Sequence, residues 1–178
     1  MEERFLCYIK GGKPLGSQLF EKGARNTSDP LKSKMFTLSH RLYFAKDKSK
    51  WGRGGVAFIE NESNVHVTTY SKAYLITTEQ FTDIVAQENG LSTLHIDYHS
   101  FYKKGFLDIV DGWYGRLLSI GEIDNIPVAT FTSPEDLDLS QRFPPAQPYV
   151  AVILNGLQEL GLTLEESISY LKNHYPGH

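Results

Sequence analysis

The stretch at residues 40–60, HRLYFAKDKSKWGRGGVAFIE, decides the fold because it holds two strand patterns joined by a glycine-rich connection. Side chains at residues 42–45 alternate between two faces, and residues 56–59 resume a β-like run, which predicts a pair of strands. The connection contains WGRGG at residues 51–55. Glycine permits positive φ and close backbone approach, and a tryptophan is large enough to anchor a turn. We therefore expect either a packed turn or a turn that rims a pocket.

Composition places the chain among packed globular proteins. It has 178 residues, 40% of them hydrophobic and 12% aromatic, which favours one domain over residues 1–178. The formal net charge is −3 and the basic residues are scattered, so neither nucleic acid nor a membrane is expected as a partner. The sequence carries no signal for the oligomeric state.

Cysteine usage and the first residues bear on the compartment. Cys7 is the one cysteine, so no intrachain disulfide is possible, and we expect a buried, unreactive thiol. The start of the chain has neither the basic nor the long apolar segment of a signal peptide, and no run approaches the length of a membrane span. A soluble cytoplasmic protein is the expectation.

Periodicity predicts both strands and helices along the rest of the chain. Strand patterns lie at residues 4–9, at 65–76 with a bend or bulge at 71–72, and at 94–99, 115–121 and 127–131. Helix patterns lie at residues 17–22, 77–88, 149–161 and 163–175. Two of these helices begin with capping-box spacing, Thr77 with Gln80 and Thr163 with Glu166. The residues at 26–34 are expected to form a polar connection.

Glu88 ends the predicted helix at residues 77–88 in an unusual place. Phe81, Ile84 and Val85 mark an apolar stripe, and Glu88 occupies the next position on it. A carboxylate in the last turn can lean outward into water. If it points inward instead, desolvation and the negative end of the helix dipole should both raise its pKa. A carboxylate tuned in this way can act as a general acid or base near neutral pH.

Two other segments offer polar groups for binding or catalysis. Glycines and a proline at residues 10–18 separate the first predicted strand from a helix amino terminus, where free backbone N–H groups could hold an anion or a carbonyl oxygen. This is not a Walker loop, because the G-K-[ST] ending is missing. His95, Asp97 and His99 share one face of a predicted strand and could bind a metal ion, although a polar solvent face gives the same pattern.

Several motifs in the same order resemble the γ-glutamylcyclotransferase family, including its plant AIG2-like members. The early Tyr-Gly-Ser-Asn loop of the family resembles Leu15-Gly16-Ser17-Gln18, or, in another alignment, Tyr8 with Gly11-Gly12. The family's strand pair with its glycine turn resembles residues 40–57, and its helix ending in glutamate resembles residues 81–90, with Glu88 in the glutamate's place. The proline-rich lead-in to a later helix resembles residues 144–149, with Tyr149 at the family's tyrosine.

The resemblance implies an α+β fold, with a small bent mixed β-sheet or barrel and helices around it. It also implies cleavage of a γ-glutamyl amide by its own α-amine, which releases 5-oxoproline and an amine. Glu88 would carry the proton as general acid and base, and the backbone N–H groups of Gly16 and Ser17 would hold the oxyanion. The implied substrate-binding residues are Leu15, Gly16, Ser17, Gln18, Tyr8, Gly11 and Tyr149. The partner would be a small γ-glutamyl compound, with no metal and no organic cofactor.

Two other functions stay open. The first is a binding or regulatory module that keeps the fold without turnover, because a fold does not entail an activity and the early loop departs from the family at Leu15 and Gln18. The second is a metal-dependent hydrolase that uses His95, Asp97 and His99 as ligands.

Overall fold

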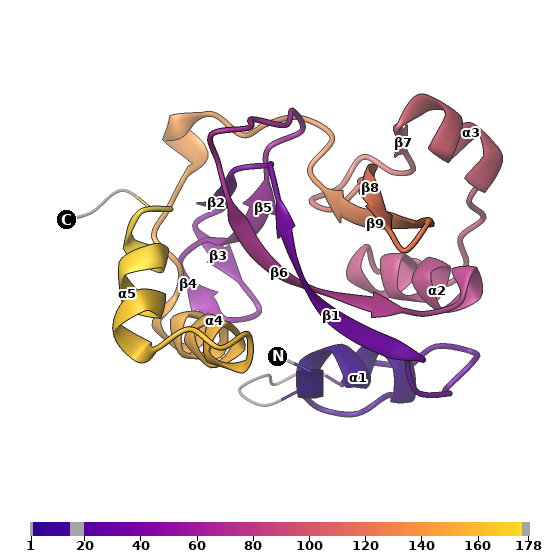
Figure 1. Cartoon of the computed structure of the whole chain (residues 1–178), viewed down its shortest axis with the longest axis horizontal. Coiled ribbons are helices and arrows are strands. Elements are labelled where there is room, and N and C mark those ends of the chain that lie inside the picture. The colour runs from indigo at the N-terminus through magenta and orange to yellow at the C-terminus, as the bar shows by residue number, and fades with distance from the viewer. Residues whose placement is uncertain (1, 15–19, 176–178) are drawn as a thin grey trace.

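The structure, a computed structural model, describes residues 2–14 and 20–175, and Figure 1 shows the course of the chain. The helices are α1 (Glu2–Lys10), α2 (Thr78–Glu88), α3 (Tyr98–Lys104), η1 (Leu139–Gln141, a 3-10 helix), α4 (Gln147–Glu159) and α5 (Leu164–Lys172). The strands are β1 (Lys32–Leu38), β2 (Leu42–Ala45), β3 (Lys48–Ser49), β4 (Gly52–Arg53), β5 (Val56–Ile59), β6 (Thr69–Leu75), β7 (Phe106–Asp108), β8 (Arg116–Ile123) and β9 (Ile126–Thr132).

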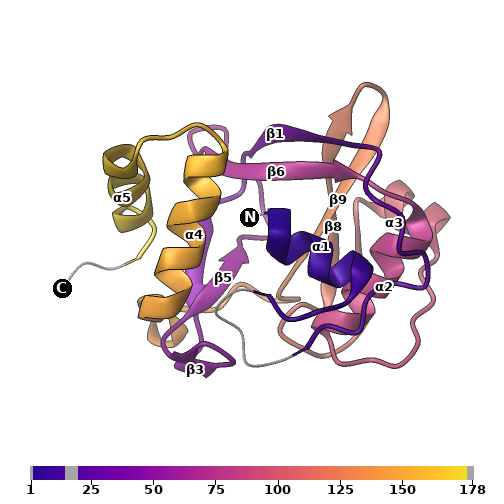
Figure 2. The same ribbon diagram turned by 90° about the horizontal axis from the view of Figure 1, so that it is seen from below.

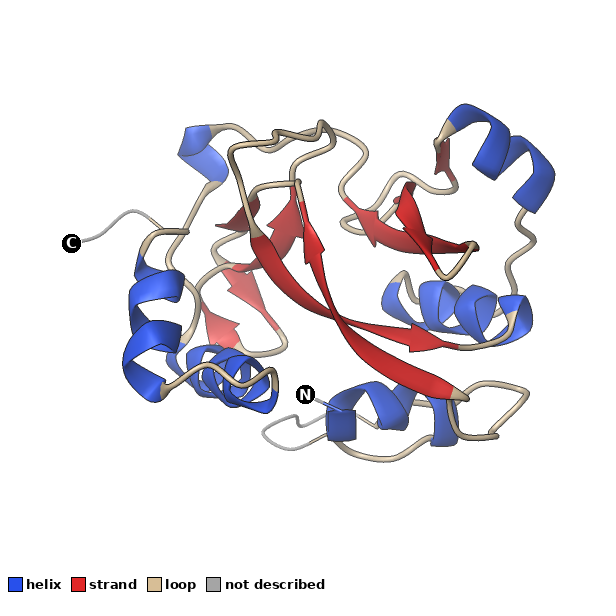
Figure 3. Cartoon of the chain, in the orientation of Figure 1, coloured by secondary structure: helices blue, strands red, loops and turns tan. Residues whose placement is uncertain are grey.

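The long antiparallel pair β1–β6 crosses the middle of the molecule (Figure 1). On one side of it lie the pairs β2–β5 and β3–β4 with α4 and α5, and on the other lie α2, α3 and the sheet β7–β8–β9. Figure 2 shows α1 between α4 and α2. Within the described residues the strands form small antiparallel sheets that do not close into a barrel, and the helices lie around them (Figure 3). The predicted α+β class is confirmed.

The strand pair predicted from residues 40–60 is confirmed as β2 and β5. Their antiparallel register pairs Leu42 with Ile59. Trp51, in the turn between β3 and β4, is buried. Gly54 has a φ of 126°, and a Cβ on it would lie 2.5 Å from the backbone nitrogen of Ala146. The glycine-rich turn is therefore packed closely against the segment that leads into α4, and a side chain at this position has no room.

Both predicted capping boxes are present. The hydroxyl of Thr77 accepts a hydrogen bond from the backbone N–H of Gln80 at 3.1 Å, and the Gln80 side chain accepts one from the backbone N–H of Thr77 at 3.0 Å. Thr163 and Glu166 repeat this exchange at 3.2 and 2.7 Å. These reciprocal bonds satisfy backbone donors that a helix start leaves free, so α2 and α5 begin where the sequence predicts.

The strand predicted at residues 4–9 is wrong, because these residues belong to helix α1. Phe5 and Ile9 lie four residues apart and so share a helix face, and Tyr8 and Ile9 are buried. Acidic residues in the first turn and Lys10 in the last turn complement the helix dipole. A short apolar run fits a strand and a buried helix equally well, and here the charges at its ends mark the helix.

The helix predicted at residues 17–22 lies partly outside the described residues. Residues 20–22 are not helical. Glu21 instead forms an antiparallel β-bridge with Gly12 through backbone hydrogen bonds of 3.0 and 2.8 Å. The helix prediction is therefore wrong for residues 20–22, where Glu21 pairs with Gly12 in the segment that follows α1.

Two predictions in the middle of the chain also need correction. Residues 94–97 form no strand, and α3 begins at Tyr98 with Asp97 as its N-cap, whose carboxylate accepts a hydrogen bond from Ser100 N at 3.0 Å. Residues 32–38, the first three of which are expected in a polar connection, form strand β1. Most of β1 is exposed, so its sequence lacks the apolar alternation that marks a half-buried strand.

Buried side chains gather in clusters that follow these elements. One surrounds β2 and β5 and includes Tyr43, Trp51, Phe58 and Val152. Another lies under α2, α3 and β8 and includes Val85, Phe101 and Leu117. A third joins α1 to α2 through Tyr8, Ile9 and Ile84. No helix within residues 2–14 and 20–175 has the length and apolar character needed to cross a membrane.

Candidate functional site

The packing of α1 against α2 places Glu88. Ile9 on α1 and Ile84 on α2 are buried in one cluster. Gln87 on α2 links this helix to α1, because its amide nitrogen donates to the backbone oxygen of Tyr8 at 3.0 Å. Its amide oxygen accepts from the backbone N–H of Gly23 at 3.0 Å, which ties α2 to the segment after α1. Glu88, the last residue of α2, therefore lies beside the carboxyl-terminal half of α1.

A phenol and a guanidinium from α1 meet the carboxylate of Glu88. The Tyr8 hydroxyl donates a short hydrogen bond to Glu88 Oε1. Arg4, one helical turn before Tyr8, donates from Nη2 to the Tyr8 hydroxyl at 3.0 Å and lies 3.9 Å from Glu88 Oε1. The side chain of Glu88 is 15% exposed and that of Arg4 is 18% exposed. The acid thus points into the protein, where it is hydrogen-bonded and close to a positive charge.

The protonation states of Tyr8 and Arg4 follow from this environment. Burial raises the pKa of the Tyr8 hydroxyl above its ordinary value, and the negative charge of Glu88 raises it further. Tyr8 therefore stays protonated and acts as a donor. Burial alone would lower the pKa of Arg4, but the facing oxygens of Tyr8 and Glu88 outweigh it, and the pKa is raised. Arg4 stays a cation.

Aromatic side chains and a second ion pair complete the group. The Arg4 guanidinium carbon lies 4.9 Å from the ring centroid of Trp51, which stacks on Tyr149 with the centroids 5.3 Å apart. Lys50 Nζ lies 3.1 Å from Glu21 Oε1 and 3.4 Å from the Tyr8 hydroxyl. We call Arg4, Tyr8, Glu21, Lys50, Trp51, Glu88 and Tyr149 the Glu88 cluster.

One donor of the Glu88 cluster is unused within the part of the chain that the structure describes. Arg4 Nη1 is buried and has no hydrogen-bond partner there. A buried donor of a charged group without a partner costs free energy of about 1–3 kcal/mol. Such a donor calls for an explanation, and a bound acceptor oxygen supplies one.

The structure brings together some of the predicted site residues. Tyr8 and Glu88 are hydrogen-bonded, and Tyr149 joins them through Trp51 and Arg4. Gly11 lies just beyond α1, where its N–H donates to Cys7 O at 2.9 Å. The remaining predicted residues, Leu15, Gly16, Ser17 and Gln18, lie outside the described residues.

The possible metal ligands are not brought together. His95 and Asp97 are exposed in the irregular segment before α3, and His99 is exposed within α3. Their shared strand face does not exist, because the strand does not form. Within the described residues no group of three or more histidine, cysteine, aspartate or glutamate side chains is placed to hold a metal ion.

Sequence reasoning missed Arg4, Lys50 and Glu21 as members of this site. The spacing of Arg4 and Tyr8 is i, i+4, which brings the two side chains into contact only if residues 2–10 form a helix. In a strand they would share a face but lie about 13 Å apart. Reading the segment as a strand hid that relation. No pattern in the sequence connects Lys50 to Glu21, since a loop and a turn 29 residues apart bring them together.

Two hollows of the described surface lie away from the Glu88 cluster. One, of about 450 Å³, is lined by residues of β6 and α5. The other, of about 150 Å³, is lined by Glu2, Leu6, Asp29, Pro30, Lys32, Ser33 and Tyr74. The cluster itself is only partly open to solvent, as the low exposure of its charged side chains shows.

Comparison with known proteins gives an informative match among the curated proteins. No family model matches the chain, and no solved structure matches it. Among curated proteins the chain is similar to one named histone deacetylase 5 from Arabidopsis thaliana, with 35% identity over 190 aligned residues. The alignment covers 94% of this chain but 28% of that relative, so the chain spans well under a third of the relative's length.

These comparisons correct the resemblance drawn from the sequence. Assignment to the γ-glutamylcyclotransferase family is wrong, because no family model matches and the similar curated protein bears a deacetylase name. The expected cleavage of γ-glutamyl amides to 5-oxoproline is contradicted with it. The glycine turn that suggested the resemblance has a structural reason, because Ala146 approaches Gly54 too closely for a side chain. The segment before the early loop is a helix rather than the strand that the resemblance implies.

Proposed function

We propose that the chain is a small-molecule-binding module whose site is the Glu88 cluster. The observation that carries the proposal is the buried guanidinium nitrogen Arg4 Nη1, which has no hydrogen-bond partner among residues 2–14 and 20–175. A ligand with a carboxylate or carbonyl oxygen would satisfy this donor, and charge-assisted bonds of this kind are among the stronger hydrogen bonds.

The remaining groups of the cluster narrow the chemistry of the ligand. Glu21 and Lys50 pair with each other, and Glu88 accepts from Tyr8, so neither carboxylate is left without a donor. Trp51 and Tyr149 supply apolar surface beside Arg4. A compact molecule that joins an acceptor oxygen to a short apolar portion suits this combination, since binding sites pair apolar walls with a few placed polar groups.

A ligand panel tests the proposal. Thermal unfolding of the purified chain is followed with C2–C6 carboxylic acids, their primary amides and the free amino acids. A ligand that binds the folded state at about 100 times its Kd stabilises it by about 2.7 kcal/mol, which is readily detected. We expect at least one class to raise the unfolding temperature of the wild type, and Arg4→Gln to abolish the effect.

Glu79→Gln is the control for the loss of a side-chain charge elsewhere on α2. Glu79 lies on α2 like Glu88, but its side chain is 47% exposed and pairs with Arg25 at 3.5 Å. We expect this variant to respond to ligand as the wild type does. A response that survives in Arg4→Gln, or no response to any of the three classes, contradicts the proposal.

We place this module in the cytoplasm, with a small molecule rather than nucleic acid or a membrane as its partner. Cys7 is the one cysteine of the chain, which suits a reducing compartment. Several basic side chains, including Lys10, Arg25 and Arg116, are paired with carboxylates. Imaging of a fluorescently tagged chain should show a cytoplasmic signal, and a secreted or membrane-bound signal would contradict this location.

The name of the Arabidopsis relative favours a second candidate, a part in deacetylation. Because the match covers 28% of that relative, the counterpart of this chain would act there as an accessory segment. Deacetylation of an acetylated histone peptide is measured with the full-length relative and with a form that lacks the matched segment. A change in rate supports the second candidate. Equal rates, together with no acetate released by the present chain, would remove it.

A further inference from the structure

Strand β1 has one edge that no other strand of the described sheets covers. There β1 pairs with β6 alone, and Figure 2 shows it at the border of the molecule with β6 between it and α1. The first four residues of β1 and Thr37 are exposed, and Met35 is 51% exposed. A strand edge of this kind presents unpaired main-chain groups to any chain that can lie beside it.

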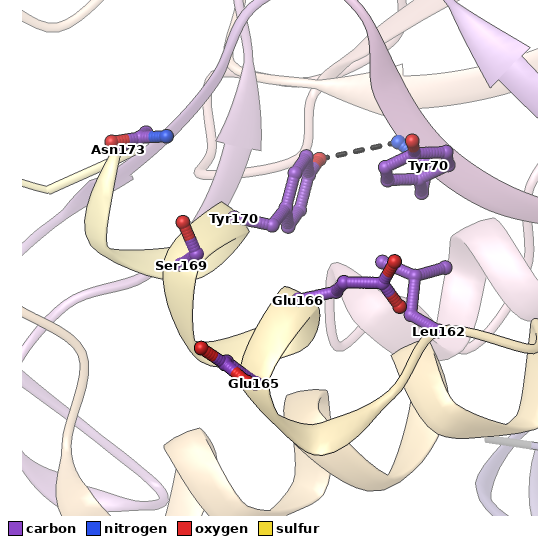
Figure 4. A pocket seen from close by; sticks show the side chains of 7 residues that line it. All are labelled: Tyr70, Leu162, Glu165, Glu166, Ser169, Tyr170 and Asn173. Carbon is purple, nitrogen blue, oxygen red and sulfur yellow. Dashed lines mark hydrogen bonds between the residues drawn. The ribbon is translucent and has the colours of Figure 1, made fainter.

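The register of β1 with β6 shows which main-chain groups point outward. In an antiparallel pair, positions whose N–H and C=O groups face the partner strand alternate with positions where both groups face away. Tyr70 of β6 is of the second kind, because its N–H donates to the Tyr170 hydroxyl on α5 at 3.2 Å (Figure 4). Its partner Thr37, and with it Met35 and Ser33, therefore directs these groups away from β6. None of these outward groups has a hydrogen-bond partner among residues 2–14 and 20–175.

Two lysines give this edge a positive charge. Lys32 and Lys34 lie two residues apart, so their side chains share one face of β1. Both are exposed, and neither has an ion pair in the part of the chain that the structure describes. Glu2 and Asp29, which line a hollow together with Lys32, are already paired with other lysines. Lys32 and Lys34 are therefore available to the acidic side chains of a partner.

An antiparallel partner strand would set its side chains directly against the two lysines. Because the outward groups belong to Ser33, Met35 and Thr37, the positions opposite Lys32 and Lys34 are non-hydrogen-bonded pairs. There the Cα atoms are about 4.5 Å apart and the side chains are closest, so opposite charges stabilise the pair. A second copy of β1 with its outward groups matched would instead bring the Lys34 side chains of both copies near each other. Like charges thus disfavour a second copy as the occupant.

A half-buried phenylalanine extends the pattern along the same face. Phe36 lies two residues beyond Lys34 and packs against the cluster of Leu38, Ile59 and Leu118. An apolar side chain opposite Phe36 would cover the part of the ring that is still exposed. Read from its amino terminus, an antiparallel partner then has an apolar residue and, at the second and fourth positions after it, two acidic ones.

We propose that the free edge of β1 binds an extended acidic segment of a partner protein as an added antiparallel strand. Main-chain hydrogen bonds to Ser33, Met35 and Thr37 hold the segment, and its two carboxylates pair with Lys34 and Lys32. Main-chain bonds of this kind supply affinity, and the alternate side chains supply specificity. The site is separate from the Glu88 cluster and does not depend on a ligand there.

Nuclear magnetic resonance titration and amide hydrogen exchange of the full chain test this site. The probe is the peptide Thr-Thr-Val-Thr-Glu-Thr-Glu-Thr, acetylated and amidated at its ends. In the free protein the amides of Ser33, Met35 and Thr37 should exchange faster than those of Lys34 and Phe36, which face β6. The peptide should cause saturable shifts in β1 and slow the exchange of the first three amides.

Modified peptides separate the charge from the main-chain pairing. Glutamine in place of the glutamates should weaken binding by about two- to fivefold for each, as expected of a cross-strand ion pair, and lysine should abolish binding. N-methylation of the threonine between valine and glutamate removes the N–H opposite Met35 and should abolish binding. N-methylation of the glutamate that follows, whose N–H points away from β1, should not change it.

Variants of the protein make the same separation. Lys34→Glu should weaken the glutamate peptide and let the lysine peptide bind, whereas Lys103→Glu, at an exposed residue of α3, should change neither. Met35→Pro removes an outward N–H, which an edge strand tolerates, and should lose binding while its circular dichroism stays native. Equal binding of the glutamate and glutamine peptides, or binding that survives N-methylation opposite Met35, overturns the proposal. So does protection of the edge amides that grows with protein concentration, which would make the occupant a second copy.

Discussion

Tyr8 and Glu88 lie 80 positions apart in the sequence and form one hydrogen-bonded pair in the fold. Glu88 follows from the apolar stripe of α2, where a carboxylate replaces the next apolar side chain. Arg4 does not follow, because its relation to Tyr8 depends on the helix that the apolar run concealed. At the scale of single residues, the sequence therefore predicts the acid of the site but not the cation that sits beside it.

A double-mutant cycle measures the bond between Tyr8 and Glu88. Tyr8→Phe removes the donor to a buried charged acceptor, and we expect it to lower the free energy of unfolding by about 2 kcal/mol. Once Glu88→Gln is present, the same change should cost less, giving a coupling energy of about 1–2 kcal/mol in urea titrations. Tyr102→Phe, at a side chain 37% exposed, serves as control and should change little. Strict additivity of the two changes would mean that the pair does not interact.

At the scale of elements, the sequence predicts best where a local signal sets the boundary. The capping boxes at Thr77 and Thr163 begin α2 and α5 as expected. The failures are α1, read as a strand, and α3, hidden because Asp97 was taken as one of an alternating set rather than as an N-cap. In both segments the order of polar and apolar residues fits the period of a helix and that of a strand, so tertiary contacts decide which of the two forms.

Substitution of two glycines in one hairpin distinguishes the cost of a close packing contact from the cost of a positive φ. Gly52 and Gly54 have φ of 100° and 126°, but a Cβ at Gly52 would meet nothing within 4 Å, whereas one at Gly54 would meet Ala146. We expect Gly52→Ala to cost about 1 kcal/mol from positive φ alone. Gly54→Ala should cost about 1–3 kcal/mol more, because the α4 lead-in must move. Equal losses in urea unfolding would show that the close approach is not required.

The contact between α2 and the segment after Gly23 predicts a pH dependence. Burial of Asp83 favours its protonated form, but hydrogen bonds of 2.8 and 3.0 Å from Arg25 outweigh this and hold its pKa below the ordinary value. A lowered pKa gives stability that is present above the ordinary pKa of aspartate and is lost as pH falls through the lowered value. Wild type should therefore exceed Asp83→Asn in stability at pH 7, and the difference should vanish near pH 2. A difference that stays constant with pH would contradict this assignment.

At the scale of the whole molecule, the sequence predicts one domain over residues 1–178, and this stays a prediction. The β1–β6 pair runs between two groups of elements (Figure 1), with separate buried clusters on either side. Another cluster, of Leu38, Ile59 and Leu118, joins β1, β5 and β8. Composition indicates a packed core but not how it is divided, because that division depends on contacts between residues far apart in the sequence.

Unfolding measured at two places tests whether these groups form one domain. Trp51 is buried beside β2 and β5, whereas Trp113 is 41% exposed in the loop before β8. In Trp113→Phe, fluorescence follows Trp51 alone, and circular dichroism follows the helices of both groups. We expect the two urea transitions to coincide, as in a cooperative domain. Transitions with different midpoints would divide the chain into two units.

The indole N–H resonance of Trp51 gives the most direct test of the Glu88 cluster as a ligand site, since the Arg4 guanidinium lies over this ring. The signal is followed while carboxylic acids, amides and amino acids are titrated into the wild type and into Arg4→Gln. A ligand site predicts a saturable shift of Trp51, with Trp113 unmoved, that disappears in Arg4→Gln. A Trp51 signal that no compound moves, or a shift that persists without Arg4, would contradict it.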